Sequence, residues 1–131
     1  MSAEALTRVA AVARSWEAAC RSLDNERILD HLAEDATVWY NFDPGRTHDR
    51  AGYRAILDDS AKSFRNQRYE DMRVHFHPNG FVEQATLVGD TAKGVVETPF
   101  LLVATVAGDK IVKIEEYFDT TIMKQAGLAD G

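Results

Sequence analysis

The residue that points most directly to chemistry is an acidic side chain on an apolar strand face. Residues 110–119 read KIVKIEEYFD, a pattern of β-branched and aromatic residues that predicts a strand. Because strand side chains alternate between faces, Glu116 shares a face with Ile114 and Phe118. Burying an unpaired carboxylate costs several kcal/mol, so such a group is paired, protonated or used. Glu116 therefore either lines an internal cavity as a general acid or base, or is turned outward by a bulge or an early strand end.

A catalytic carboxyl group needs a polar partner, and a strand predicted over residues 36–42 supplies two candidates. Tyr40 could donate a hydrogen bond to a developing oxyanion, and Asn41 could polarise an oxygen. The two are neighbours in the strand and therefore face opposite sides, with Trp39 on the side of Asn41. The alternation does not decide which side faces inward.

Two loop residues and two strand histidines are further candidates. Asp43 and His48 follow the strand near the expected pocket mouth, where His48 is either catalytic or a surface residue. His75 and His77 share one strand face as a His-x-His pair. This pair is a metal half-site, an acid or base for a substrate hydroxyl, or a solvent-facing pair. No third ligand stands out, so no metal site is expected.

Glu83 is a second acidic residue on an apolar strand face, where it alternates with Phe81 and Ala85. It could pair with an arginine across the sheet, such as Arg73, in a structural role. Alternatively, it could share a pocket with another carboxyl group, and the two pKa values would then be pushed apart.

The composition limits the classes of function. The chain has 131 residues with 45% hydrophobic residues, which predicts one domain over residues 1–131 with a genuine core. The net charge of −6 argues against binding to nucleic acid. No long apolar run or signal-peptide pattern is present, so we expect no membrane segment and a cytoplasmic location. Cys20, the single cysteine, is expected to be a small buried thiol.

Hydrophobic periodicity predicts three helices, mostly before a run of strands. Asp24 or Asn25 would cap the short second helix, and Asp49 would cap the third. Pro99 predicts a bulge or an edge position in its strand. This order indicates an α+β fold in which a curved mixed or antiparallel sheet covers the helices. The predicted long helices cover residues 4–22 and 49–64, and the predicted strands cover residues 36–42, 69–77, 81–88, 94–106 and 111–119.

Four segments together resemble the SnoaL-like branch of the NTF2-like superfamily. They are LAEDATV at residues 32–38, VWYNFD at 38–43, NGFVEQ at 79–84 and KIVKIEEYFD at 110–119. The resemblance covers nearly the whole chain. It implies a cone in which a bent sheet wraps around a long helix and encloses an apolar pocket. It also implies a homodimer that works without metal or cofactor.

Two enzymes of this superfamily keep their site residues at positions that can be compared. The resemblance to ketosteroid isomerase places Trp16, Tyr40 and Leu101 or Leu102 where that enzyme has its tyrosine and two aspartates. Steroid isomerisation by that route is therefore not expected.

Limonene epoxide hydrolase matches the chain at a different set of positions. The resemblance places Asn41 at its asparagine, Trp39 at its tyrosine and Glu116 at its second aspartate. Its arginine and first aspartate should fall within residues 83–86, where neither residue is present.

These observations predict a cofactor-independent lyase or isomerase that acts by general acid/base catalysis on a hydrophobic, aromatic or polycyclic small molecule. Dehydration, retro-aldol cleavage and proton transfer all fit. The alternatives are a binding protein without turnover and an epoxide hydrolase with a rearranged site. The residues expected to line the pocket and bind substrate are Trp16, Trp39, Phe42, Tyr53, Glu83, Phe100 and Phe118.

Overall fold

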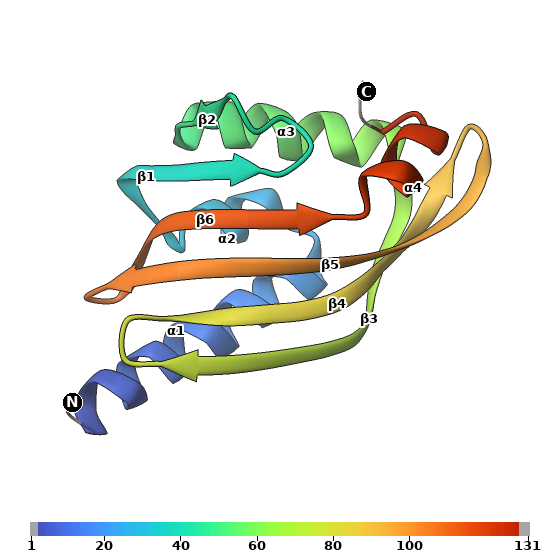
Figure 1. Cartoon of the computed structure of the whole chain (residues 1–131). Coiled ribbons are helices and arrows are strands. Elements are labelled where there is room, and N and C mark those ends of the chain that lie inside the picture. Colours follow the sequence, from blue (N-terminus) through green and yellow to red (C-terminus); the bar gives the residue numbers. More distant parts are fainter. Residues whose placement is uncertain (1–2, 129–131) are drawn as a thin grey trace.

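The computed structural model describes residues 3–128 as helices packed on an open six-stranded sheet (Figure 1). This arrangement confirms the predicted α+β class. No helix in this range is long and apolar enough to cross a membrane. The elements are α1 (Ala3–Ser22), α2 (Asn25–Leu29), β1 (Leu32–Tyr40), β2 (Thr47–His48), α3 (Arg50–Ser63), β3 (Arg65–His77), β4 (Gly80–Thr91), β5 (Gly94–Ala107), β6 (Lys110–Phe118) and α4 (Thr120–Gln125).

The sheet has the strand order β2-β1-β6-β5-β4-β3. Strands β1 and β6 are parallel, and every other neighbouring pair is antiparallel. Because β1 is the first strand in the chain and β6 is the last, this parallel pair brings together two strands that are far apart in sequence. It also places Tyr40 directly beside Glu116.

An aspartate occupies the N-cap position of α2, α3 and α4, a position that this residue type favours. Asp24 accepts hydrogen bonds from the first backbone amides of α2, and Asp119 does the same for α4. Asp49 accepts a 2.8 Å hydrogen bond from the amide of Gly52 at the start of α3. These bonds satisfy amides that have no partner within their own helix.

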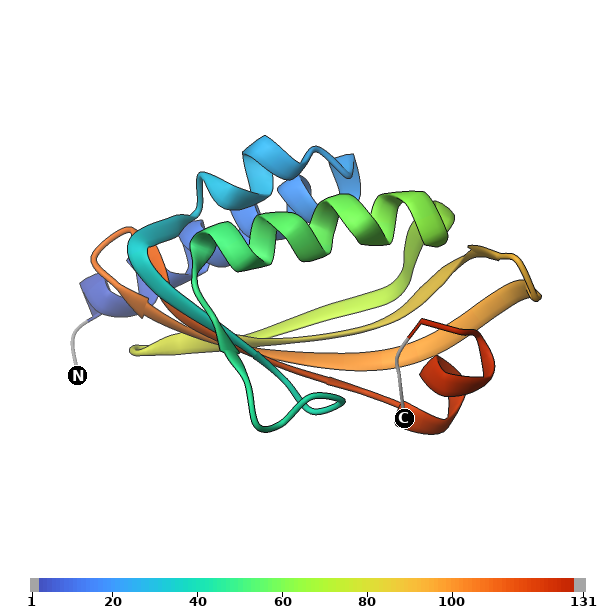
Figure 2. The same cartoon turned by 90° about the horizontal axis from the view of Figure 1, so that it is seen from above.

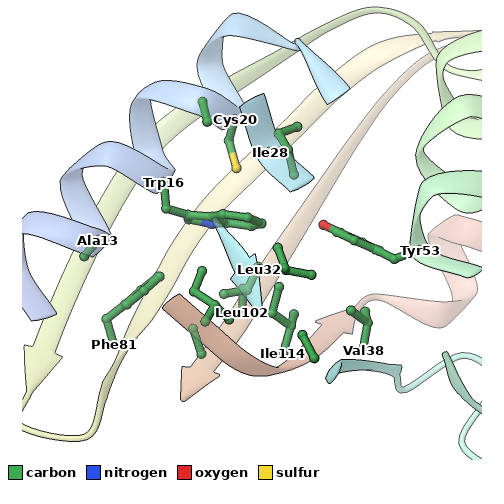
Figure 3. Packing of buried hydrophobic residues seen from close by; sticks show 14 of the residues in the cluster. Ala13, Trp16, Cys20, Ile28, Leu32, Val38, Tyr53, Phe81, Leu102 and Ile114 are labelled. Atoms are coloured by element: carbon green, nitrogen blue, oxygen red, sulfur yellow. The ribbon is translucent and has the colours of Figure 1, made fainter. Parts of the chain in front are cut away.

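The helices α1, α2 and α3 lie on the same side of the sheet (Figure 2). Between α1 and the strands, the indole of Trp16 lies against the sheet residues Leu102 and Leu32 (Figure 3). The apolar stripe predicted for α1 forms this contact. Its buried members are Val9, Val12, Ala13, Trp16, Ala19 and Cys20.

A bulge in β3 changes which side chains face the core. The register with β4 shifts between Glu70 and Arg73, and Asp71 has a positive φ of 53°. Tyr69 therefore faces inward before the bulge, and Val74 faces inward after it. Simple alternation would have put Tyr69 on the opposite face from Val74.

Pro99 was predicted to lie at a bulge or at an edge of the sheet. In the structure it lies at a local edge. It pairs with Thr86 of β4 without a register shift. On its other side, β6 ends at Phe118, which is paired with Phe100. The missing N–H of Pro99 therefore removes no bond to β6.

Gly89 should be sensitive to substitution because a Cβ atom there would overlap the ring of Phe64, the residue that ends α3. We expect Gly89→Ala to lower the free energy of unfolding by about 1–3 kcal/mol, the usual cost of overpacking a core. Urea denaturation would measure the loss. Gly45→Ala is the matched control because nothing lies within 4 Å of its added methyl group. Equal stability of the two variants would contradict the prediction.

Candidate active site

One row of residues crosses the inner face of the sheet and contains two carboxyl groups and a phenol. The strand register aligns Tyr40 of β1 with Glu116 of β6, then Leu102 of β5, then Glu83 of β4. All four side chains are buried. On β1, it is therefore Tyr40, and not its neighbours Trp39 and Asn41, whose side chain faces the core.

The rows on either side of this polar row are apolar. On one side the register aligns Val38, Ile114, Ala104 and Phe81, which are all buried. On the other side it aligns Phe118, Phe100 and Ala85. The polar row therefore lies in low-dielectric surroundings, which make ionisation of its carboxyl groups costly.

Glu116 is the carboxyl group of this row that borders open volume. Its residue is 8% exposed, and its side chain lines a cavity of about 340 Å³. Burial raises the pKa of this carboxyl to about 7, while a hydrogen bond donated by the Tyr40 hydroxyl opposes the rise by stabilising the carboxylate. Glu116 can therefore give or take a proton near neutral pH.

Glu83 is more deeply enclosed than Glu116. It is 0% exposed, and neither of its carboxyl oxygens has a hydrogen-bond partner among the described residues. Burial raises its pKa to about 8, with a further contribution from the negative charge of Glu116. Glu83 does not line the cavity. The predicted pairing with Arg73 is not found, since Arg73 is exposed.

The cavity lies beside α3, α4 and the inner face of the sheet, and most of its wall is apolar. Ile56 and Leu57 come from α3, and Met123 comes from α4. Aromatic rings cover the sheet side in a continuous chain of contacts. Their centroid separations are 4.8 Å for Tyr40–Phe42, 5.9 Å for Phe42–Phe118, 5.6 Å for Phe118–Phe100 and 5.7 Å for Phe100–Tyr69.

Two further phenols, Tyr53 of α3 and Tyr69 of β3, line the same cavity. Burial raises the pKa of both hydroxyls well above the usual value, so both remain protonated at neutral pH. Figure 3 shows the Tyr53 hydroxyl pointing from α3 toward the interior of the core. Protonated phenols are hydrogen-bond donors, so these two can stabilise negative charge that develops on a bound molecule.

Asn41 and Trp39 occupy structural positions instead of the pocket positions considered for them. The Asn41 amide donates to the Phe118 carbonyl at 3.0 Å and accepts from the Phe118 amide at 2.9 Å, which fixes the end of β6 against β1. Trp39 lies on the opposite face from Tyr40 and donates from its indole to the Pro44 carbonyl. Its ring packs against Tyr117, and Trp39 does not line the cavity.

His75 and His77 are exposed near the end of β3 and do not line the cavity. Of the three roles considered for this pair, only the solvent-facing one matches their position. No group of three His, Cys, Asp or Glu side chains within residues 3–128 is arranged to hold a metal ion.

Trp16 and Phe100 contribute to the core and not directly to the cavity wall. Trp16 of α1 is buried and contacts the His31 ring edge-on at 5.9 Å. Phe100 lies between Phe118 and Tyr69 and supports both rings. Neither residue is part of the cavity lining.

Asp43 and His48 line the cavity. Asp43 forms an exposed ion pair with Arg46 at 3.7 Å. The His48 ring lies 5.9 Å from the Tyr40 ring, edge to face. Among the other residues predicted to bind substrate, Phe42, Tyr53 and Phe118 line the cavity.

Tyr69 is the principal cavity residue that the sequence analysis missed. Its only signal was the acidic pair Glu70-Asp71 inside a predicted strand, since such residues are disfavoured in regular strands and can mark a bulge. Met123 and Leu128 were also missed because they follow the last predicted strand.

No protein-family model and no curated protein sequence matches this chain. Solved structures match its backbone. BvnE pinacolase from Penicillium brevicompactum shares 12% identity over 95% of this chain and 92% of its own, with a TM-score of 0.81. A candidate polyketide cyclase from Xanthomonas campestris pv. campestris shares 16% identity over 96% and 99% of the two chains, with a TM-score of 0.79.

A third match is a hypothetical protein from Catenulispora acidiphila that has a ketosteroid isomerase-like fold. It shares 15% identity over 89% of this chain and 92% of its own, with a TM-score of 0.74. Identities this low establish the fold alone. The chain therefore has the NTF2-like fold, as its sequence resemblance implied.

Proposed function

We propose that this protein is a lyase or isomerase that acts on a small hydrophobic molecule by general acid/base catalysis through Glu116. The observation that carries the proposal is the environment of this carboxyl group. It is buried at the wall of a cavity and accepts a hydrogen bond from Tyr40. Neither Lys nor Arg forms an ion pair with it among residues 3–128. A carboxyl group that only supported the fold would be expected to have such a cationic partner.

The proposed first step is the transfer of a proton from a carbon next to a carbonyl group to ionised Glu116. The C–H electron pair moves to form an enolate, and Tyr53 or Tyr69 donates a hydrogen bond to its oxygen. If the substrate has a C=C bond next to the deprotonated carbon, the enolate is conjugated with it, and return of the proton to the far carbon shifts the double bond and completes an isomerisation. Loss of a β-hydroxyl group as water, with the same proton, completes an elimination.

The wall of the cavity supports a compact ring-containing substrate. Its volume of about 340 Å³ is at the lower end of the range for small-molecule sites, roughly 300–1,000 Å³. The rings of Phe42, Phe118 and Tyr69 offer flat apolar surface next to the carboxyl group. Structural neighbours named as a pinacolase and as a candidate isomerase support the same general class of reaction.

A binding protein without turnover is the second candidate. It is favoured because three of the expected catalytic side chains lie away from the cavity: Asn41 joins two strands, and His75 and His77 are exposed. Such a protein would use the same aromatic wall but would show no proton transfer.

A panel of aromatic and cyclic ketones and β-hydroxy ketones in D₂O would test the proposal. The expected result is deuterium incorporation or water loss, measured by NMR, for at least one compound that also raises the melting temperature. The matched variants are Glu116→Gln and Glu115→Gln, the latter removing a carboxylate from the outer side of the same strand. Thermal stabilisation without any exchange would favour the binding protein. Exchange that persists unchanged in Glu116→Gln would contradict the role of Glu116.

A further inference from the structure

Glu83 has no role in the step just described, and its surroundings do not explain why a carboxyl group is kept there. It is fully enclosed, and both its oxygens lack hydrogen-bond partners among the described residues. It occupies the same transverse row as Glu116, separated from it by Leu102 alone. Neighbouring strands are ~4.8 Å apart, so the two residues are about 10 Å apart along the row.

The charges around Glu83 do not provide a counter-ion. The positive charge of Arg21 on α1 slightly opposes the rise in the pKa of Glu83. However, Arg21 is paired with Glu17 at 3.4 Å and is half exposed. Within residues 3–128, the cavity beside Glu116 is also lined by Asp43, Arg46, His48 and Asp59, of which Arg46 is paired with Asp43 at 3.7 Å. The titratable groups that act on the two carboxyl groups from within the core are acidic or neutral. They are Glu17 and Cys20 of α1, Tyr69 of β3, Glu116 of β6, Tyr40 of β1 and Tyr53 of α3.

The two carboxyl groups differ in what stabilises their ionised forms. Glu116 receives a hydrogen bond from Tyr40 and borders the cavity. Glu83 receives no hydrogen bond from the described residues and borders no open volume. A single negative charge shared by the pair is therefore placed on Glu116, and the second ionisation is opposed by repulsion from the first.

We propose that Glu83 is a positioning residue for Glu116: the two carboxyl groups, held in one row with Leu102 between them, form a coupled pair whose first negative charge is held on Glu116 while Glu83 stays protonated. This inference rests on the proposed role of Glu116 as the base. While Glu83 remains protonated, the pKa of Glu116 stays close to neutral pH. A catalytic group with such a pKa can both accept and return a proton efficiently. When Glu116 accepts the substrate proton, the pair becomes neutral and Glu83 keeps its own proton.

Titration of the side-chain carboxyl carbons by NMR in protein labelled with ¹³C-glutamate would test the coupling without any substrate. The resonances of the pair are assigned by their loss in Glu83→Gln and Glu116→Gln. In wild type, both are expected to titrate above the exposed carboxylates. In Glu116→Gln, the midpoint of Glu83 should fall on the order of one pH unit, as expected for charges about 10 Å apart at an effective dielectric constant of about 20. In wild type, the Glu116 resonance should also shift at the higher pH at which Glu83 ionises. In Glu83→Gln, this second, higher-pH step should disappear from the Glu116 titration curve.

Glu115→Gln is the control because it removes a charge next to Glu116 in sequence but on the outer face, where it is paired with Lys113. It should leave both midpoints unchanged. Each of the two buried variants detects the coupling from the opposite member of the pair, so one folded variant is sufficient. An unchanged Glu83 midpoint in Glu116→Gln, or an upper step that persists in the Glu116 curve of Glu83→Gln, would overturn the proposal, because a purely structural Glu83 would alter stability without this coupling. Because no substrate is used, this result is independent of whether a ketone is turned over.

Discussion

Raising the pH is expected to destabilise this protein strongly, because two buried carboxyl groups must ionise inside the folded structure. Burial raises the pKa of Glu83 from 4.5 to about 8 and that of Glu116 from 4.5 to about 7. Between the ordinary pKa of 4.5 and the raised pKa of each group, the folded state binds more protons than the unfolded state. The free energy of unfolding therefore falls as the pH rises from about 4.5 to about 8, and this contribution is constant outside that range.

The size of the effect follows from the shifts. One pKa unit corresponds to ~1.4 kcal/mol, so full ionisation of Glu83 costs about 5 kcal/mol and that of Glu116 about 3 kcal/mol. Domains of this kind have stabilities of about 5–15 kcal/mol, so the loss is a large part of the total. Urea denaturation at a series of pH values would measure it.

Glu83→Gln isolates the contribution of one carboxyl group. The variant keeps the size of the side chain but cannot ionise, so its stability relative to wild type should rise by several kcal/mol between the acidic and alkaline ends of the series. Glu115→Gln, at a partly exposed ion pair, should give a curve parallel to wild type. A Glu83→Gln curve that is also parallel to wild type would show that Glu83 is not a buried ionising group.

The elements of the fold were predictable because they depend on local patterns. The apolar stripe of α1 and the aspartates that cap α2 and α3 are readable in sequence, and each is found in the structure. The inward face of β6 was also predictable, since Glu116 alternates with Ile114 and Phe118 without interruption. Side chains of a regular strand alternate between the two faces of the sheet, so one residue known to face the core determines which face every other residue is on.

The composition of the site was less predictable because it depends on events that break this regularity. The bulge at Asp71 reverses the parity of β3 and brings Tyr69 into the cavity. The position of Asn41, one residue beyond the end of β1, allows its side chain to imitate a strand pairing with Phe118. Neither feature has a hydrophobic period that could be read along the chain.

The alignment of Glu83 with Glu116 illustrates a second limit. Each residue could be recognised separately as a carboxyl group on an apolar face. Their distance depends on the register of two strand pairs that both include Leu102, which is set by turns and packing across the whole sheet. Sequence alone therefore predicts two unusual side chains but not a coupled pair.

Removal of the Glu116 carboxyl group should have the largest effect on turnover. Once an active compound is known, we expect Glu116→Gln to lower kcat/KM by about 10²-fold to 10⁴-fold, the usual contribution of a general acid or base. Gln keeps the size of the side chain and can still accept a hydrogen bond from Tyr40, so the fold should be retained. Circular dichroism and the melting temperature would verify this.

Tyr40→Phe should act on the same carboxyl group in a different way. Loss of the hydroxyl removes the hydrogen bond that stabilises ionised Glu116, so the pKa of Glu116 should rise above about 7. The rising limb of the pH–rate profile should move to higher pH, with a loss on the order of 10-fold near neutrality and recovery at higher pH. If Tyr40 instead contacts the substrate, the plateau will fall and the midpoint will not move. Because Tyr40 acts through Glu116, the double variant should be no less active than Glu116→Gln alone, whereas additive losses would indicate two independent roles.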